Sequence, residues 1–218
     1  MLVPQPDAKL LSLIFLLDTP SSRVLLGMKK RGFGMGKYNG FGGKLEPGET
    51  MPECASRELH EESGCLVPVE KLQARGRMHF HMLNDSGMLD KKSGKIIPHL
   101  YVYLFTAELK DVAEGEVTES DEMRPEWFDY ASVPLEKMWQ DDQYWLPTLL
   151  SGSDVVGAFE FSSQEVIERK NIKALPRGEY AKDAEAHAAA VALSAKAEAA
   201  TAATDVEKEN DAPAFEGT

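Results

Sequence analysis

The sequence contains little cysteine and no excess of positive charge. Only two of its 218 residues are cysteines, Cys54 and Cys65, and the formal net charge is −12. A helix between the two cysteines would separate them by roughly 16 Å, which is too far for a disulfide bond. An acidic chain has no electrostatic hold on nucleic-acid polymers or on anionic membranes. We therefore expect reduced thiols, and neither a nucleic-acid polymer nor a membrane as a partner.

Long apolar runs are also missing. The apolar stretch at residues 10–17 is interrupted by Ser12 and is too short to span a bilayer. No secretory signal is recognisable, and reduced thiols are typical of the cytoplasm. We expect a monomeric, cytoplasmic protein, with a nuclear or mitochondrial location left open.

What is present suggests one folded domain with two appendages. Apolar residues make up 43% of the chain, which is enough for one good core. Residues 1–8 contain two prolines and are predicted to form a flexible arm, whereas residues 9–175 are predicted to form the domain. From residue 181 to 218 the composition becomes rich in alanine, and residues 182–218 hold eight acidic residues against three lysines. This segment is predicted to be a disordered acidic tail.

Short apolar segments and turn residues predict the order of the elements. Lys9–Asp18 is predicted to be a buried strand, and Arg23–Lys29 the strand that returns from it after a turn. Residues 84–95 are polar and predict a long hairpin loop. Further strands are predicted at residues 75–83, 96–109, 124–129 and 155–161, and helices at residues 144–150 and 164–173.

The central stretch of the sequence predicts a capped helix. Thr50 and Glu53 have the spacing of a capping box, and Gly64 is suited to end the helix in a left-handed conformation. Between these limits, apolar residues recur every four positions and predict one buried stripe. The residues of that stripe are Met51, Ala55 and Leu59.

Three carboxylates crowd one side of this helix. Glu58 and Glu62 are four residues apart, and Glu61 is three residues from Glu58. Like charges at this spacing destabilise a helix, whereas a hard divalent cation would reverse the effect. A solvated acidic face is the alternative interpretation.

The spacing around the helix decides between these interpretations. Gly43, Glu49, Arg57, the three glutamates and Gly64 form the pattern Gly-x5-Glu-x7-Arg-Glu-x2-Glu-Glu-x-Gly. With ordinary usage of about one in fifteen for each residue, seven matches have a chance probability on the order of 10⁻⁸. The pattern resembles the Nudix box, although Cys65 stands where Ile, Leu or Val is usual. The resemblance implies the α/β Nudix fold, an α/β/α sandwich with a mixed β-sheet and the box as its loop and helix.

The resemblance to Nudix hydrolases also implies a chemistry. These enzymes cleave a nucleoside diphosphate linked to another group, using Mg²⁺, for which Mn²⁺ can substitute. The resemblance implies Glu58, Glu61 and Glu62 as catalytic residues and metal ligands, with Gly42 and Glu122 as further ligands. It implies an ion pair between Glu49 and Arg57 that holds the loop to the helix. Which carboxylate takes a proton from water stays open, with Glu62 favoured.

Further motifs resemble one branch of the family, the eukaryotic MutT homologues. They occupy residues 25–34, 39–44, 119–125 and 138–145, and the similarity covers roughly residues 9–175. This branch hydrolyses oxidised purine nucleoside triphosphates, 8-oxo-dGTP and 2-oxo-dATP, to the monophosphate and pyrophosphate. The resemblance therefore implies such a triphosphate as the substrate.

The same resemblance implies a substrate-binding set. Trp139 would stack on the purine, and Asp141 and Asp142 would face its edge. Two adjacent carboxylates cannot both ionise cheaply, so one would keep its proton and act as a donor. Core packing is the alternative for Trp139, and a surface position is the alternative for Lys29 and Lys44. The complete set is Ser12, Lys29, Phe33, Asn39, Phe41, Gly42, Gly43, Lys44, Phe80, Met123, Trp139, Asp141 and Asp142.

The sequence departs from this branch at a few places. Tyr38 stands where animal members have Trp, Met82 stands where an aromatic residue is expected, and residues 85–94 form an insertion. Two alternative functions are therefore kept. One is hydrolysis of another nucleoside diphosphate derivative, such as a dinucleotide polyphosphate or ADP-ribose. The other is a nucleotide sensor without turnover, against which the complete carboxylate set argues.

Overall fold

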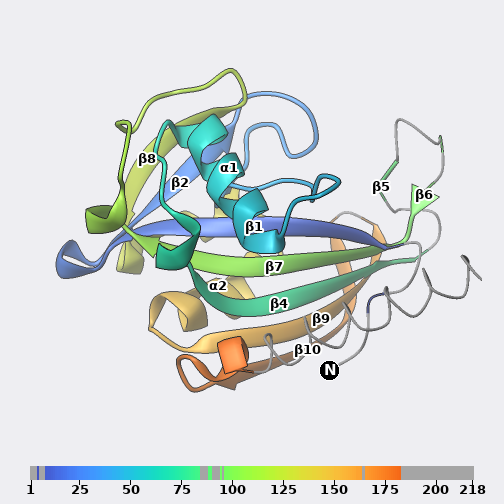
Figure 1. Cartoon of the computed structure of the whole chain (residues 1–218). Helices are drawn as coiled ribbons and strands as arrows, with labels where there is room; N and C mark the ends of the chain where they lie inside the picture. Colours follow the sequence, from blue (N-terminus) through green and yellow to red (C-terminus); the bar gives the residue numbers. More distant parts are fainter. Residues whose placement is uncertain are drawn as a thin grey trace, which may run out of the picture. The chain divides into compact units, whose positions relative to one another are not determined.

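A mixed β-sheet of eight strands is the framework of the fold (Figure 1). The computed structural model describes residues 4, 8–83, 88–89, 94, 96–163 and 165–182, with only the backbone at 88 and 89. Residues 2–181 form one compact unit, and the second unit, Met1 with residues 182–218, lies almost wholly outside the described residues. The predicted arm, the insertion at 85–94 and the acidic tail fall mostly outside them too.

The sheet has the order β10-β9-β4-β7-β1-β2-β3, and β8 pairs with β2. The β1–β7 and β4–β9 pairs are parallel and the other pairs are antiparallel. A separate two-stranded ribbon is formed by β5 and β6. The bounds are β1 Lys9–Asp18, β2 Arg23–Lys29, β3 Tyr38–Asn39, α1 Met51–Ser63, β4 Gln73–Met82, β5 Met88–Leu89, β6 Ile96–Ile97, β7 His99–Glu108, β8 Met123–Asp129, α2 Asp142–Leu150, β9 Asp154–Ser163 and β10 Val166–Leu175.

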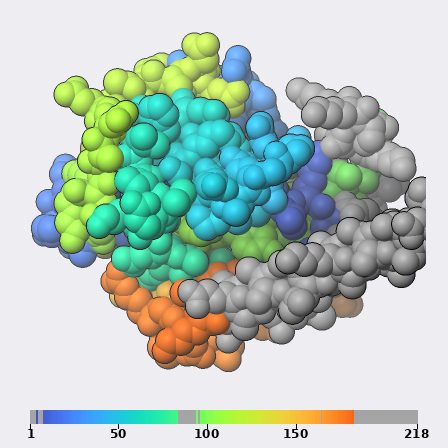
Figure 2. All heavy atoms as spheres, in the orientation of Figure 1, coloured from blue at the N-terminus to red at the C-terminus, as the bar shows by residue number. Residues whose placement is uncertain are grey.

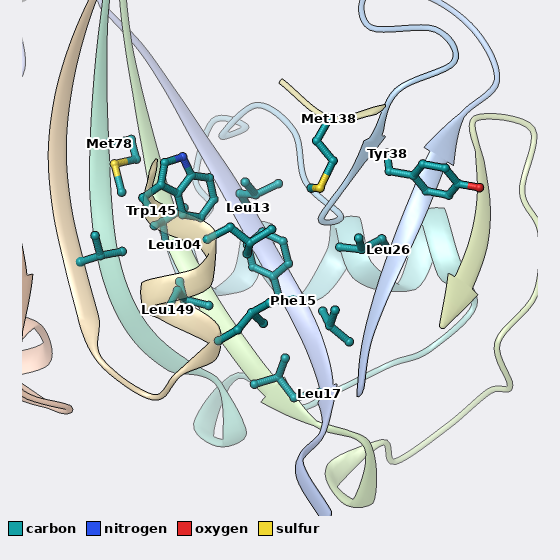
Figure 3. Packing of buried hydrophobic residues seen from close by; sticks show 14 of the residues in the cluster. Leu13, Phe15, Leu17, Leu26, Tyr38, Met78, Leu104, Met138, Trp145 and Leu149 are labelled. Carbon is teal, nitrogen blue, oxygen red and sulfur yellow. The ribbon is translucent and has the colours of Figure 1, made fainter. Parts of the chain in front are cut away.

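One face of the sheet packs against α2. Side chains of a strand alternate between its two faces, so Leu13 and Phe15 of β1 point to the same side. Both belong to the core cluster that contains Trp145 and Leu149 of α2, as Figure 3 shows. The rings of Phe15 and Trp145 meet edge to face with centroids 6.0 Å apart. These contacts fix α2 beneath the central strands.

The other face of the sheet packs against α1. Ile14 and Leu16, the alternate residues of β1, share a second core cluster with Ala55 and Leu59 of the helix. Because α1 and α2 cover opposite faces, the predicted α/β/α sandwich with a mixed sheet is confirmed.

The helix predicted at the centre of the sequence is present. Thr50 caps α1 and forms the full capping box with Glu53, while Gly64 ends the helix at φ 79°. Cys54 and Cys65 are both free and buried, as expected. Among the described residues, no helix has the length and apolar character needed to cross a membrane. The cytoplasmic location and the monomeric state stay predictions.

The helix predicted at residues 164–173 is wrong, because residues 166–173 belong to strand β10. It runs antiparallel to β9, and Ile167 and Ile172 pack against the α2-side core. Pairing with a neighbouring strand here overrides the weak helical preference of the polar residues. The strand predicted at 96–109 is divided by Pro98 into β6 and β7. Inside the predicted loop at 84–95, residues 88–89 form β5.

Candidate active site

A cavity of about 540 Å³ lies beside α1. Six of the residues that line it carry carboxylates and three carry permanent or near-permanent positive charge, which suits a metal-bound anion better than an apolar ligand. The lining residues are Lys29, Arg31, Gly42, Gly43, Glu46, Arg57, Glu58, Glu61, Glu62, Ser120, Asp121 and Glu122. Glu58, Glu61, Glu62 and Glu122, which the resemblance implies as metal ligands, are thus brought together.

Glu62 is at the floor of this cavity. The residue is only 4% exposed, and its Oε2 accepts a hydrogen bond of 2.9 Å from the backbone N–H of Gly42. Its Oε1 lies 3.7 Å from the ammonium of Lys29. Burial raises the pKa of Glu62 to about 7, against the opposing effects of Gly42 and Lys29. A carboxyl that titrates near neutrality can take or release a proton at that pH.

Two glycines let the chain approach the helix carboxylates closely. A Cβ on Gly43 would lie 2.1 Å from Oε1 of Glu58, and a Cβ on Gly42 would lie 2.1 Å from the carbonyl oxygen of Ser12. A side chain at either position would displace the loop or the carboxylate. Burial also raises the pKa of Glu58. Gly43 is therefore required by its packing against Glu58, and Gly42 by the close approach of the loop to the backbone of β1.

Arg57 joins the loop to the helix. Its Nε donates to Glu49 at 2.7 Å, which confirms the predicted ion pair. Its Nη1 lies 3.0 Å from Glu58 and 3.1 Å from Glu61, and its Nη2 donates to the carbonyl of Lys44 at 3.3 Å. One guanidinium thus holds three carboxylates in place.

The wall opposite α1 comes from β2 and from the segment before β8. Figure 2 shows this segment beside α1 on the same face, and Ser120 Oγ donates to the carbonyl of Glu62 at 3.1 Å. Lys29 Nζ lies 3.5 Å from Glu122, and Arg31 Nη2 lies 2.7 Å from the same carboxylate. The Arg31 guanidinium is the main cause of a lowered pKa at Glu122.

Four lining residues were not predicted from the sequence: Arg31, Glu46, Ser120 and Asp121. Arg31 comes directly before the glycine-rich loop, and this position could have indicated that its side chain lies near a bound phosphate. Ser120 and Asp121 lie inside the motif at residues 119–125, whose resemblance implies no role for either residue. No local pattern marks Glu46.

The donors in the cavity fit a hard divalent cation. They are carboxylate oxygens, the ligands that Mg²⁺ and similar ions prefer, and the buried carboxyl of Glu62 has a raised pKa that a nearby positive charge would lower. Within the described part of the chain, no three acidic, histidine or cysteine side chains already converge on one point. The cavity therefore fits a divalent cation by the chemical type of its donors and by their common location in the cavity.

A second group of predicted residues lies around Trp139, just before α2. The ring of Phe33 stacks on Trp139 at 4.8 Å between centroids with an interplanar angle of 21°. The ammonium of Lys37 lies 5.0 Å from the Trp139 ring and 3.4 Å from the carbonyl oxygen of Met138. Asn39 Oδ1 accepts from the backbone N–H of Gly40.

Asp141 and Asp142 are buried beside this tryptophan. Asp141 is 6% exposed and accepts a hydrogen bond of 2.9 Å from the indole N–H of Trp145. Asp142 is 2% exposed and accepts from the backbone N–H of Trp139 at 3.0 Å. Burial raises the pKa of Asp141 to about 6. Burial, with repulsion from Asp141, raises the pKa of Asp142 well above its usual value.

The remaining predicted residues lie in the core or near it. Phe41 and Met123 are 0% and 2% exposed in the α1-side core cluster, so the structure does not bring their side chains to the cavity wall. Ser12 is buried, with its Oγ 3.2 Å from the sulfur of Cys54. Phe80 packs against the α2-side core. Tyr38 is buried too, and its hydroxyl donates to Glu126 at 2.7 Å.

Comparison with known proteins identifies the family. The model of the NUDIX domain matches residues 11–149, more than half of the chain. The chain belongs to the Nudix family. It is a Nudix hydrolase, and enzymes of this family generally use divalent metal ions.

Two curated relatives are similar over most of their length. A protein of Danio rerio is 44% identical over 160 residues, which cover 73% of this chain and 91% of the relative. A protein of Mus musculus is 41% identical with the same coverage. Both are named oxidized purine nucleoside triphosphate hydrolase. Among solved structures, the MutT protein of Bacillus halodurans matches with a TM-score of 0.60 and 25% identity, covering 76% of this chain and 97% of that one.

Proposed function

We propose that this Nudix hydrolase converts oxidised purine nucleoside triphosphates, 8-oxo-dGTP and 2-oxo-dATP, to the monophosphate and pyrophosphate with Mg²⁺. The observation that carries the proposal is the acidic cavity in which Glu58, Glu62 and Glu122 face Lys29 and Arg31. The names of the Danio rerio and Mus musculus relatives support the choice of substrate. This hydrolysis would remove oxidised purine nucleoside triphosphates from the nucleotide pool.

The hydrolysis needs a water oxygen to bond to a phosphorus atom while a bridging P–O bond breaks. A polyphosphate chain repels the incoming water until its charge is compensated. Glu58, Glu61, Glu62, Glu122 and the carbonyl of Gly42 would hold Mg²⁺, which supplies charge neutralisation and a more acidic bound water when present.

The residues of the chain contribute three further functions. Glu62, buried at the floor of the cavity, is the favoured group to take the proton that the attacking water releases. Lys29 supplies a fixed positive charge 3.7 Å from that carboxylate. Arg57 keeps Glu58 oriented through their contact at 3.0 Å. In-line attack depends on such fixed positions.

The base would be recognised in the region around Trp139. Stacking on an aromatic ring holds any purine and contributes affinity rather than selectivity. The two buried carboxyls provide the selectivity, because a protonated carboxyl donates a hydrogen bond and an ionised one only accepts. Asp141 and Asp142 can therefore present a donor beside an acceptor to an oxidised purine. Asn39 can both donate and accept at the purine edge.

Steady-state kinetics over a panel of nucleotides tests the proposal. We expect Mg²⁺-dependent release of pyrophosphate from 8-oxo-dGTP and 2-oxo-dATP, with kcat/KM well above that for dGTP and dATP. Faster cleavage of ADP-ribose or of a dinucleotide polyphosphate would assign the site to that substrate instead. Binding of nucleotides without any product would identify a sensor.

A further inference from the structure

Charged side chains form a ladder from the floor of the active-site cavity to its mouth. The side chain of Glu62 is 6% exposed, that of Lys29 is 25%, that of Glu122 is 45% and that of Arg31 is 62%. Lys29 Nζ lies 3.7 Å from Glu62 and 3.5 Å from Glu122, and Arg31 Nη2 lies 2.7 Å from Glu122. Negative and positive groups therefore alternate outward, and Arg31 is the outermost member of this ladder.

The three cations of the cavity differ in their partners. Arg57 holds three carboxylates, and Lys29 lies between two. Arg31 presents a planar guanidinium with five N–H donors in a fixed fork, and its bond to Glu122 uses the Nη2 end. Arg31 can therefore keep Glu122 and still donate to a second anion. A phosphate group matches that fork with two parallel hydrogen bonds.

We propose that Arg31 binds the phosphate chain at the mouth of the cavity and makes the site favour longer linear polyphosphates. A single phosphate near the floor meets Lys29, whereas a chain of two or three phosphates extends outward along the ladder to Arg31. Arg31 is thus a residue that determines specificity for chain length. The inference deepens the proposed function, on which it rests, by naming a residue for its triphosphate.

The chain contains a matched control next to this arginine. Lys30 Nζ lies 2.6 Å from Glu119 and donates to the carbonyl of Ser120 at 2.7 Å, and Lys30 is not among the residues that line the cavity. Arg31→Gln and Lys30→Gln each remove one positive charge from adjacent positions. A general change in surface charge would therefore affect both variants alike.

The experiment is isothermal titration of the full chain, in Mg²⁺, with orthophosphate, pyrophosphate and tripolyphosphate. We expect the affinity of the unchanged protein to rise with chain length. Loss of a charge-assisted contact should lower tripolyphosphate affinity about tenfold in Arg31→Gln and leave orthophosphate affinity unchanged. Lys30→Gln should resemble the unchanged protein. Arg31→Lys keeps the charge without the fork and should show an intermediate loss; it also serves if Arg31→Gln fails to fold.

Three results would overturn the inference. They are an unchanged tripolyphosphate affinity in Arg31→Gln, an equal loss in Lys30→Gln, and an affinity of the unchanged protein that does not depend on chain length. These probes lack a base, so their binding does not depend on whether the site prefers oxidised purines. The nucleotide panel tests that preference separately.

Discussion

Two acidic groups lie on opposite faces of the sheet and differ in their surroundings. Beside α1, Glu58 and Glu62 line an open cavity next to Arg57 and Lys29. Beside α2, Asp141 and Asp142 are almost fully buried and accept hydrogen bonds from an indole and a backbone N–H. In both groups burial is the main cause of a raised pKa.

The difference between the groups lies in what compensates the charge. The glutamates have nearby cations and an opening through which a divalent ion can reach them, so they are suited to work in the ionised form. The aspartates are enclosed, and the cheaper response to burial is to keep a proton. In the proposed function, carboxyl groups would thus bind the metal on one face and donate a hydrogen bond on the other.

The largest effect should come from the glutamates. Glu58→Gln combined with Glu62→Gln removes two of the oxygens that would hold Mg²⁺ and the favoured proton acceptor. We expect kcat to fall by at least about a hundredfold with the affinity for the base little changed. Initial rates of pyrophosphate release measure this.

Glu70→Gln is the control for that double variant, because Glu70 is exposed in a short turn after α1. It should keep full activity. Hydrolysis that continues undiminished in the double variant would remove the basis for a catalytic role of these carboxylates.

The next effect concerns Trp139. Removing its ring in Trp139→Ala takes away a stacking surface, so KM for purine triphosphates should rise about tenfold. Oxidised and ordinary purines should be affected alike, because stacking does not read the base edge. Trp139→Phe should recover most of the loss. A KM that does not change in Trp139→Ala would support the alternative of ordinary core packing.

A smaller effect should appear in the pH dependence of stability. The pKa of Asp141 is raised from 3.8 to about 6 in the folded protein, so the folded state binds its proton more tightly than the unfolded state. The free energy of unfolding should therefore fall as the pH rises from about 4 to about 6, by on the order of 2 kcal/mol. Denaturant unfolding of the unchanged protein and of Asp141→Asn measures this contribution.

Asp141→Asn should show a shallower decline, because its amide has no charge to bury and its oxygen can still accept from Trp145. The part of the decline that comes from buried Asp142 should remain. Identical pH profiles for the two proteins would contradict the raised pKa. Measuring the pH dependence of unfolding for variants of Glu58 or Glu62 would require a fixed metal concentration, because a bound cation changes the pKa of these carboxyls.

The smallest effect should come from the cap of α1. Thr50→Ala removes one hydrogen bond of the capping box and should lower the free energy of unfolding by about 1 kcal/mol. Both faces should keep their function, so selectivity and KM should not change. A loss of activity larger than the loss of folded protein would show that the cap also positions the glutamates.

The sequence predicts the α1 site better than the α2 side. A helix with a capping box places Glu58 and Glu62 on one surface by its own geometry, so local spacing was sufficient. The contact of Arg31 with Glu122 joins residues far apart in the sequence, which only tertiary structure brings together. The core positions of Phe41 and Met123 depend on which face of the sheet each side chain meets.

Strand β10 illustrates the same limit. Its polar residues have no strong periodicity, and its conformation is decided by pairing with β9. Capped helices and buried apolar strands could be predicted because their signals are local. Edge strands and cavity walls could not be predicted, because residues distant in the sequence determine their conformation and their lining.

The most direct test of the division between the two faces is the selectivity ratio, kcat/KM for 8-oxo-dGTP over kcat/KM for dGTP, in two variants. Glu62→Gln should lower both values in parallel and leave the ratio unchanged, whereas Asp142→Asn should change the ratio. A ratio that is altered by Glu62→Gln and untouched by Asp142→Asn would contradict the account.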